Sequence, residues 1–385
     1  MKRTAINRRI VYLAGFLFSL PLALTSYINS SFLENYISSK YVGVLYTCAA
    51  VLTITSLMFM PRLLSKLGNL RVSIILSLIF SLSLLVLGLD GNGAWVLPAF
   101  IMYFVCSILI VTTLDIFIED FSGNKSVGKL RGTYLTITSL AWVLSQVISG
   151  SIISRTSYGG IYFISGILSL LMACVLYFFL QKFKDPVYKK MVLVRTCKTF
   201  LKNKNLGKAY LINLILKFFY AWMVIYTPIY LHGNLGFGWD EIGIIFSIML
   251  LPFVLVTFPL GKLSDKIGEK KILALGFLIA TGTVFTIPFI QEHSILIWAL
   301  VLFATRVGAA TIEIMSESHF FKIVKEEDVD EISFFRNTGP VSFIIAPLVA
   351  IPVLLYTPSF EFIFFALSAI LLLGLFITLR LKDVK

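Results

Sequence analysis

The sequence is poor in charged residues and lacks the common catalytic signatures. Asp, Glu, Lys and Arg make up 14% of its 385 residues, against about 25% in a typical soluble domain. Its four cysteines form no CxxC pair and no cluster with the three histidines, so neither a disulfide framework nor a zinc site is indicated, and we expect no cofactor. A Walker loop, an HExxH helix and a GxSxG elbow are also missing, which argues against direct ATP drive and against the common hydrolases. We therefore do not expect an enzyme.

Hydrophobic residues dominate what is present. They account for 58% of the chain, 34 residues are Phe, and the mean hydropathy is +0.91. A soluble fold has too little interior to hide that much apolar surface. One membrane span takes about 20 apolar residues, so a chain of this length has room for about twelve spans with short loops. The basic start followed by an apolar run is similar to a signal peptide, but it has no convincing cleavage site, and we interpret it as the first span.

Twelve apolar runs bounded by charged and turn residues are expected to cross the membrane. They cover residues 10–29, 41–60, 72–89, 95–117, 132–154, 160–181, 209–231, 240–260, 271–290, 294–316, 333–356 and 360–379. A basic stretch separates the first six from the last six. The prediction is therefore an N-terminal six-helix bundle over 1–181, a linker over 182–208 and a C-terminal six-helix bundle over 209–385.

The basic residues predict the orientation of the spans. If the N-terminus is inside, 29 of the 33 Lys and Arg residues fall in inner segments, and only Lys40 and Arg155 fall in outer loops. Cytoplasmic loops of membrane proteins carry such an excess. We expect a multi-pass protein of the plasma (inner) membrane with both termini in the cytoplasm. The net charge of +13 then reflects contact with anionic lipid headgroups rather than with nucleic acid.

The linker combines basic and apolar residues. The apolar residues Val194, Cys197 and Leu201 recur every three to four positions and are interleaved with basic residues such as Arg195 and Lys198. This pattern favours an amphipathic helix on the inner membrane surface. A solvated basic tether is the alternative.

The two halves of the sequence resemble each other. Residues 61–71 read PRLLSKLGNLR and residues 261–271 read GKLSDKIGEKK, so that at an offset of 200 Lys66 matches Lys266 and Gly68 matches Gly268. Acidic pairs with an i, i+4 spacing also recur at the ends of the fourth and tenth spans. Two six-span halves in the same orientation are one of the known plans of secondary transporters.

The 261–271 segment resembles the GxLaDrxGrk loop motif of the major facilitator superfamily. The first-half copy is degraded, with Pro61 and Ser65 at the Gly and Asp positions. The resemblance covers the whole chain in span count, linker and loop lengths. It implies an all-α membrane protein of twelve transmembrane helices in two pseudo-symmetric six-helix bundles around a central cavity, which opens alternately to the two sides.

The resemblance also implies a cytoplasmic gate. In the family, this loop and its acidic partners latch the inner side closed. The motif residues are Gly261, Asp265, Gly268, Lys270 and Lys271, and the matching charge network is Asp115, Glu119, Arg131, Glu313, Glu317 and Arg336. The alternative is ordinary surface charge that only marks the topology.

The fifth span has the small-residue spacing of a motif found in antiporters of the superfamily. Gln146 stands where that motif has proline. Close helix packing in lipid favours the same small residues, so the pattern lends only weak support to efflux.

Two basic residues lie inside predicted spans, where a charge is costly unless it has a partner or a function. Arg306 lies near the middle of the tenth span and Lys217 lies in the seventh, two spans that line the cavity in the resembled fold. They are expected either to bind an anionic or polar substrate group and take part in coupling, or to form a fixed ion pair such as Lys217 with Glu313. Further cavity candidates are Asn213, Tyr220, Tyr27, Tyr103, Trp142 and Gln146.

The sequence therefore predicts a secondary active transporter that moves a small molecule by alternating access. Protons are the first candidate for the coupling ion, with efflux as one direction. Uptake or facilitated diffusion of a small anionic or polar metabolite is the alternative, and a non-transporting membrane sensor or scaffold is a third class. We expect a monomer in the lipid bilayer, and we expect the histidines, which fall at span ends, to be solvated.

Overall fold

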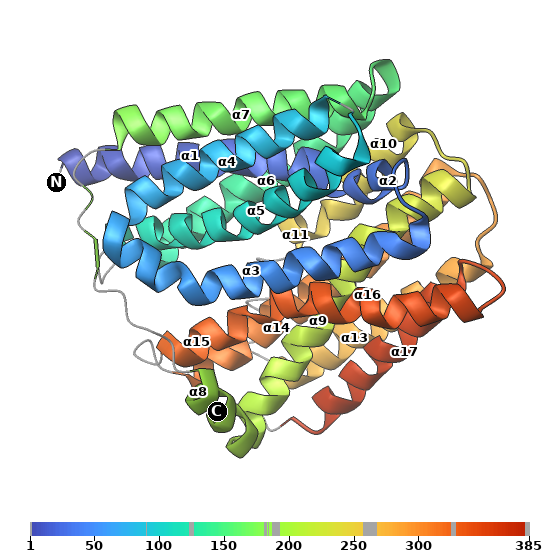
Figure 1. Ribbon diagram of the computed structural model, residues 1–385. Helices are drawn as coiled ribbons and strands as arrows, with labels where there is room; N and C mark the ends of the chain where they lie inside the picture. Colours follow the sequence, from blue (N-terminus) through green and yellow to red (C-terminus); the bar gives the residue numbers. More distant parts are fainter. Residues whose placement is uncertain are drawn as a thin grey trace. The chain divides into compact units, whose positions relative to one another are not determined.

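The computed structural model describes residues 2–89, 91–122, 127–180, 183, 185–186, 193–256, 268–324 and 329–381. All regular structure in these ranges is helical (Figure 1). Eleven of the described helices are long and apolar enough to cross a membrane. The chain divides into two compact units, one formed by residues 1–37 and 48–190 and the other by residues 38–47 and 191–385.

The helices of the first unit include five of these candidate spans, and α3, whose first residues are grouped with the second unit, is a sixth. Their bounds are α1 (Lys2–Ser26), α2 (Asn29–Leu33), α3 (Ser39–Leu67), α4 (Asn69–Gly88), α5 (Gly93–Ser122), α6 (Val127–Arg155) and α7 (Tyr158–Phe179). Helix α1 packs against α5, α6 and α7, and α4 packs against α5 and α7.

The second unit repeats this arrangement. Its helices are α8 (Leu193–Lys202), α9 (Lys204–Ile229), the π-helical turn η1 (Tyr230–Asn234), α10 (Trp239–Leu250), α11 (Pro252–Leu255), α13 (Glu269–Thr286), the 3₁₀ turn η2 (Ile287–Phe289), α14 (Ile295–Ile323), α15 (Val329–Arg336), α16 (Thr338–Tyr356) and α17 (Phe362–Leu379). Helix α9 packs against α14, α16 and α17, and α13 packs against α14 and α17. These pairings are the same as those of α1 and α4 in the first unit, shifted by half the chain.

The predicted eighth span, 240–260, is described only in part. It begins as α10, turns at Leu251 and continues as the short helix α11 from Pro252. Proline lacks the backbone N–H of a helix interior, which explains the break at this point. The remainder, from residue 257, lies outside the described residues.

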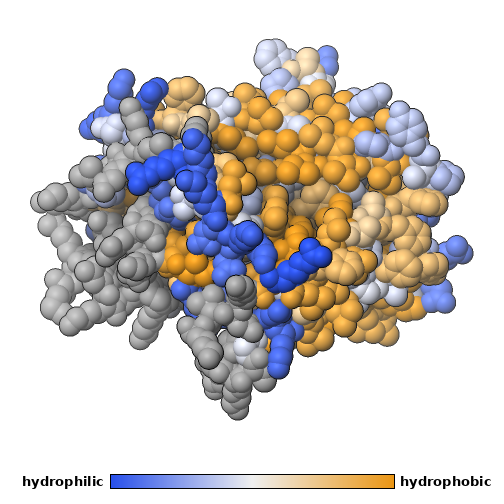
Figure 2. Space-filling view, turned by 90° about the horizontal axis from the view of Figure 1, so that it is seen from below, coloured by the Kyte–Doolittle hydropathy of each residue, from blue (hydrophilic) through white to orange (hydrophobic). Residues whose placement is uncertain are grey.

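The helices are apolar on their outer as well as their inner faces. Leu82 on α4 is 63% exposed and Leu373 on α17 is 58% exposed. Figure 2 shows hydrophobic side chains over much of the visible surface, with the hydrophilic side chains gathered in smaller areas. A surface of this kind suits lipid rather than water.

The repeat is also visible in the backbone. Gly68, before α4, has φ 81° and ψ 153°, and Gly268, before α13, has φ 84° and ψ 151°. A positive φ is strained for any residue with a Cβ atom. The two turns therefore keep one conformation at an offset of 200 residues, although only the second keeps the full loop motif.

Helices α13 and α14 approach each other closely at glycines. A Cβ atom on Gly308 would lie 2.7 Å from the backbone oxygen of Gly276 and 2.7 Å from the backbone nitrogen of Ala280. Small residues permit such contacts between helices in lipid. Helix α14, which carries Arg306 and Glu313, is thereby held firmly against its neighbour.

Candidate functional site

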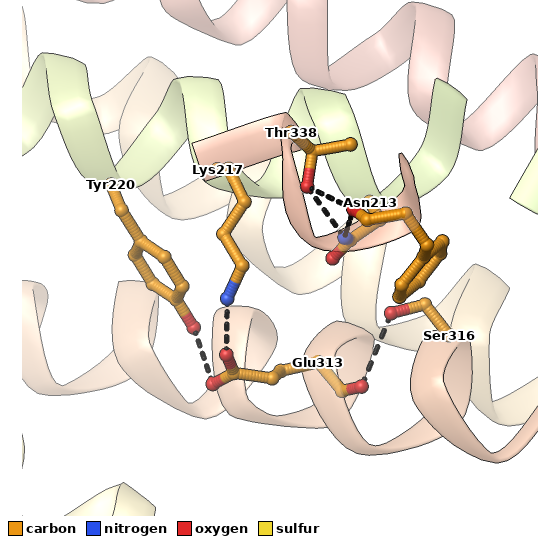
Figure 3. Close-up of polar contacts among 7 residues, drawn as sticks. Asn213, Lys217, Tyr220, Glu313, Ser316 and Thr338 are labelled. Atoms are coloured by element: carbon orange, nitrogen blue, oxygen red, sulfur yellow. Dashed lines mark hydrogen bonds and ion pairs between the residues drawn. The ribbon is translucent and has the colours of Figure 1, made fainter. Parts of the chain in front are cut away.

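A charged cluster joins α9 to α14. Lys217 and Tyr220, three residues apart on α9, both point toward Glu313 on α14 (Figure 3). The Lys217 Nζ atom lies 2.6 Å from Glu313 Oε1, and the Tyr220 hydroxyl donates to Glu313 Oε2 at 3.1 Å. Each carboxylate oxygen thus has its own donor, and the hydrogen bond from the lysine is a charge-assisted one.

The ion pair corresponds to one of the two alternatives that the sequence leaves open for Lys217. The side chains of Lys217 and Glu313 are 26% and 28% exposed, so neither is sealed from its surroundings. The lysine Nζ also lies 5.2 Å from the centre of the Tyr220 ring. The geometry therefore links three functional groups in two helices, and a proton on Glu313 would leave Lys217 without its counter-charge.

Arg306 lies two turns before Glu313 on α14 and is more deeply buried. Only 1% of the residue is exposed. Its Cζ atom lies 4.9 Å from the ring centre of Phe219 and 5.7 Å from that of Tyr220. Within the described residues, its Nε and Nη1 atoms have no hydrogen-bond partner. The arginine is thus held by aromatic rings and lacks an acidic partner there.

Asn213 shares a helix face with Lys217 but serves helix packing. Its amide donates to the Thr338 hydroxyl at 2.8 Å, which ties α9 to the start of α16 (Figure 3). A second, longer contact of 3.5 Å reaches the Phe335 carbonyl. The amide nitrogen is therefore already engaged with protein, whereas the buried amide oxygen has no hydrogen-bond partner among the described residues.

The candidates of the first unit are placed around a separate buried network. Tyr103 on α5 shares a hydrogen bond of 2.7 Å with Thr25 and accepts one of 3.2 Å from Asn29. The Tyr162 hydroxyl donates to Asn29 at 2.8 Å. Tyr27, in the turn between α1 and α2, is also buried. These bonds link α1, α2, α5 and α7 inside one bundle.

On α6, Gln146 is buried and Trp142 is half-buried. The Gln146 amide donates to the Ala23 carbonyl of α1 at 3.0 Å. It therefore bonds α6 to α1 at the position where the antiporter motif has proline.

The predicted gate lies partly outside the described residues. This holds for Gly261 and Asp265, and also for the side chains of Glu119 on α5 and Arg131 on α6. Gly268 forms the positive-φ turn, Lys270 is partly exposed and Lys271 is exposed. The remaining charges of the network are distributed over the ends of helices: Asp115 on α5 is half-buried, and Glu317 on α14 and Arg336 on α15 are exposed.

The sequence analysis missed Glu269, the first residue of α13. Only 4% of it is exposed. Its Oε1 atom accepts from Lys322 Nζ at 2.8 Å and from the Ser318 hydroxyl at 2.5 Å. An acid in the first helical turn also suits the helix dipole. The sequence did contain a signal for this residue: Glu269 occupies a position of the loop motif where the superfamily pattern has a basic residue.

The expectation that the histidines are solvated is wrong for His319. Only 1% of His319 is exposed, and its Nδ1 atom lies 3.7 Å from Glu269 Oε2. Its position at a span end suggested solvent, but α14 continues beyond the expected end at residue 316 to Ile323. The histidine is therefore buried within the bundle.

Asp185, in the predicted linker, was also missed. Its Oδ1 atom accepts from the backbone N–H of Asn69 at 2.6 Å, at the first residue of α4. A carboxylate is favoured at a helix N-terminus. The linker thus supplies an acid to the turn at Gly68, whose own loop has Ser65 at the motif's Asp position.

The family model described as Major Facilitator Superfamily matches residues 11–240 and 211–385 of this chain. The chain belongs to the Major Facilitator Superfamily. Membership confirms the expected all-α membrane fold and identifies a membrane transporter rather than an enzyme.

Two curated relatives each match a part of the chain. An uncharacterized MFS-type transporter of Methanocaldococcus jannaschii is 21% identical over 187 residues, which are 46% of this chain and 47% of the relative. Multidrug resistance protein MdtG of Salmonella arizonae is 29% identical over 194 residues, 49% of this chain and 46% of the relative. The matched part of the chain thus spans about half the length of these relatives.

Solved structures of transporters match over nearly the whole chain. A mutant of the nucleoside transporter NupG aligns with a TM-score of 0.77 at 13% identity, covering 97% of this chain and 99% of that one. A bacterial homologue of the human lysosomal transporter Spinster, in an inward-facing, unoccupied conformation, aligns with a TM-score of 0.72 at 13% identity, covering 98% and 95%. At these identities the likeness shows the fold alone.

Proposed function

We propose that this protein is a secondary active transporter that moves a small molecule by alternating access, and that the movement is coupled to protons through Glu313. The observation that supports the coupling is the contact of 2.6 Å between Lys217 Nζ and Glu313 Oε1 in two membrane helices. Glu313 is the only acidic residue in segments 209–231 and 295–316 of the sequence.

Protonation of Glu313 would change the balance of forces between the two helices. The neutral carboxyl no longer attracts Lys217, and the ammonium is left in a setting where an uncompensated charge is costly. Helices α9 and α14 then favour a different relative position. Such a two-state element, biased by one proton, is what coupling between a proton gradient and transport requires.

The orientation of the chain belongs to the same proposal. We place both termini in the cytoplasm of a plasma (inner) membrane because the basic residues are concentrated in one set of loops. The loop motif before Gly268 then acts as the inner latch. The domain division at the 182–208 linker and the monomeric state complete the proposal.

The test uses purified full-length protein in proteoliposomes with an imposed pH gradient. Radiolabelled uridine, ethidium and benzoate serve as probes, representing a nucleoside, a drug-like cation and an organic anion. We expect gradient-driven movement of at least one probe in the wild type, and loss of the gradient dependence in Glu313→Gln. The exposed acid Glu292 provides the matched control, Glu292→Gln.

Two results would contradict the proposal. Gradient-driven movement that persists in Glu313→Gln would remove the assigned coupling residue. Specific binding of a probe without any movement across the membrane would favour the non-transporting sensor instead.

A further inference from the structure

We infer that the substrate carries an oxyanion, a carboxylate or a phosphate group, and that Arg306 is the residue that binds it. The inference rests on the proposed transport function and names its substrate class. It begins with the charge balance of the two central helices of the second unit. Segments 209–231 and 295–316 contain two cations, Lys217 and Arg306, and one anion, Glu313.

The single anion is already engaged by the other cation. Glu313 gives Oε1 to Lys217 and Oε2 to the Tyr220 hydroxyl. Arg306 lies seven residues away on the same helix, about 10 Å along its axis. One positive charge therefore remains uncompensated in these segments, in a residue that is 1% exposed. Such a charge is rarely retained inside a membrane protein without a function.

The surroundings of Arg306 leave its hydrogen-bonding edge available. Phe219 and Tyr220 lie near the guanidinium, with ring centres 4.9 and 5.7 Å from Cζ. Aromatic rings attract the flat face of a guanidinium, whereas its N–H donors point outward in the plane. Nε and Nη1 have no partner among the described residues. Nε and Nη1 lie on different edges of the guanidinium, and each edge, completed by Nη2, matches the two oxygens of a carboxylate or phosphate.

The same face of α14 carries small side chains next to Arg306. Ala309 and Ala310, three and four residues after Arg306, are buried and have only methyl side chains. The aromatic rings fix the orientation of the guanidinium before a ligand arrives, which lowers the entropic cost of binding. A neutral substrate would leave the buried charge uncompensated, so the site discriminates by charge.

Tyr220 connects this site to the proposed coupling residue. Its ring lies against both cations, 5.2 Å from Lys217 Nζ and 5.7 Å from Arg306 Cζ, and its hydroxyl bonds Glu313. An oxyanion at Arg306 would therefore be separated from the proton-sensitive carboxylate by a single side chain. This arrangement gives the substrate and the proton a short route to influence each other.

The experiment measures thermal melting and tryptophan fluorescence of the purified full-length protein at constant ionic strength, with chloride as the reference anion. The probes are benzoate, inorganic phosphate and, as the uncharged analogue of benzoate, benzamide. We expect one of the two oxyanions, and not benzamide, to raise the melting temperature of the wild type. The probe that raises the melting temperature, benzoate or phosphate, identifies the group of the substrate as a carboxylate or a phosphate.

The variants separate binding from a structural role. In Arg306→Gln we expect affinity for the oxyanion to fall about ten- to hundredfold, while the unliganded variant melts no lower than the wild type because a buried uncompensated charge has been removed. Arg306→Lys keeps the charge but loses the two-donor geometry, and an intermediate affinity is expected. Arg155→Gln, at an exposed arginine of α6, is the matched control and should bind as the wild type does.

Three outcomes would overturn the inference: no oxyanion effect on the wild type, an equal effect on Arg306→Gln, or a lower melting temperature of unliganded Arg306→Gln with unchanged affinity. Failure of the proposed function gives a different pattern. Oxyanion binding that depends on Arg306 without flux would contradict transport and leave the site intact, whereas flux of a neutral probe alone would contradict the site and leave transport intact.

Discussion

Lys217 and Tyr220 hold different oxygens of the same carboxylate, that of Glu313, so one acid on α14 is fixed by two donors on α9. The lysine supplies a charge and the tyrosine supplies a neutral hydroxyl. The contribution of each donor can therefore be separated by substitution.

We expect Lys217→Gln to lower stability more than the double variant Lys217→Gln/Glu313→Gln does. The single change leaves a carboxylate without its counter-charge, at a cost of about 1–3 kcal/mol when a partly exposed pair in a membrane helix is broken. The double change removes both charges. Thermal melting in detergent measures the difference, with Lys198→Gln on the exposed face of α8 as control. Equal losses in the single and double variants would show that the carboxylate left behind by Lys217→Gln carries no penalty, which contradicts the expectation.

Glu269 joins the beginning of α13 to the end of α14. We predict that Glu269→Gln destabilises the protein by about 1.5–3 kcal/mol, the range for hydrogen bonds that involve charged groups. Lys322, whose side chain is 48% exposed, would turn to solvent and reduce the penalty. Melting temperature is the measurement, and Lys322→Gln, which leaves the buried carboxylate without its cation, should lose at least as much as Glu269→Gln. An unchanged melting temperature in Glu269→Gln would argue that the contact is incidental.

The two matched positive-φ glycines, Gly68 and Gly268, should both lose stability on substitution. Alanine at Gly68 or Gly268 is expected to cost about 1–2 kcal/mol because of the left-handed backbone. At Gly68 the new Cβ would also lie 2.6 Å from Asp185 Oδ2, so the loss there should be larger. Gly282 is the control, because it is exposed on α13 and a Cβ atom there would have no described neighbour within 4 Å. Gly282→Ala should be neutral or stabilising by about 0.5–1 kcal/mol.

Helix α8 is attached to the second unit by aromatic packing. Phe200 is 4% exposed, and its ring centre lies 4.8 Å from that of Phe334 and 5.7 Å from that of Tyr210. We expect Phe200→Ala to cost about 3–5 kcal/mol of local stability and to increase hydrogen exchange across residues 193–202. Leu201→Ala, at a side chain that is 78% exposed, should leave the exchange unchanged. Equal protection in both variants would show that α8 is held by other contacts.

Much of the fold could be predicted because lipid imposes a simple rule on the sequence. A span must be long, apolar and internally hydrogen-bonded, so hydropathy alone located eleven of the twelve expected helices. The eighth is interrupted at Pro252. Hydropathy alone does not predict this break, because the residues on both sides of the proline are apolar. The end of the tenth was placed too early, at residue 316, because charged residues beyond it suggested a loop, whereas the helix continues to Ile323.

The site was less predictable because its partners are distant in sequence. Helical spacing indicated that Tyr220 shares a face with Lys217, and the contact with Glu313 could be proposed from charge alone. Asn213 has the same spacing but bonds Thr338 on α16. One face of α9 thus contacts two different helices, which spacing alone does not distinguish. Glu269 was missed because its partners Ser318 and Lys322 are about 50 residues away.

Helix α14 runs from Ile295 to Ile323 without a break, and this continuity determines how a movement would pass along it. Arg306 and Lys322 are sixteen residues apart on this helix, about 24 Å along its axis. If occupation of the arginine tilts this helix, the end at Lys322 moves with it, together with the Glu269 carboxylate of α13 that the lysine contacts. A single unbroken helix thus connects the middle of the bundle to its end, so a movement at one position reaches the other directly.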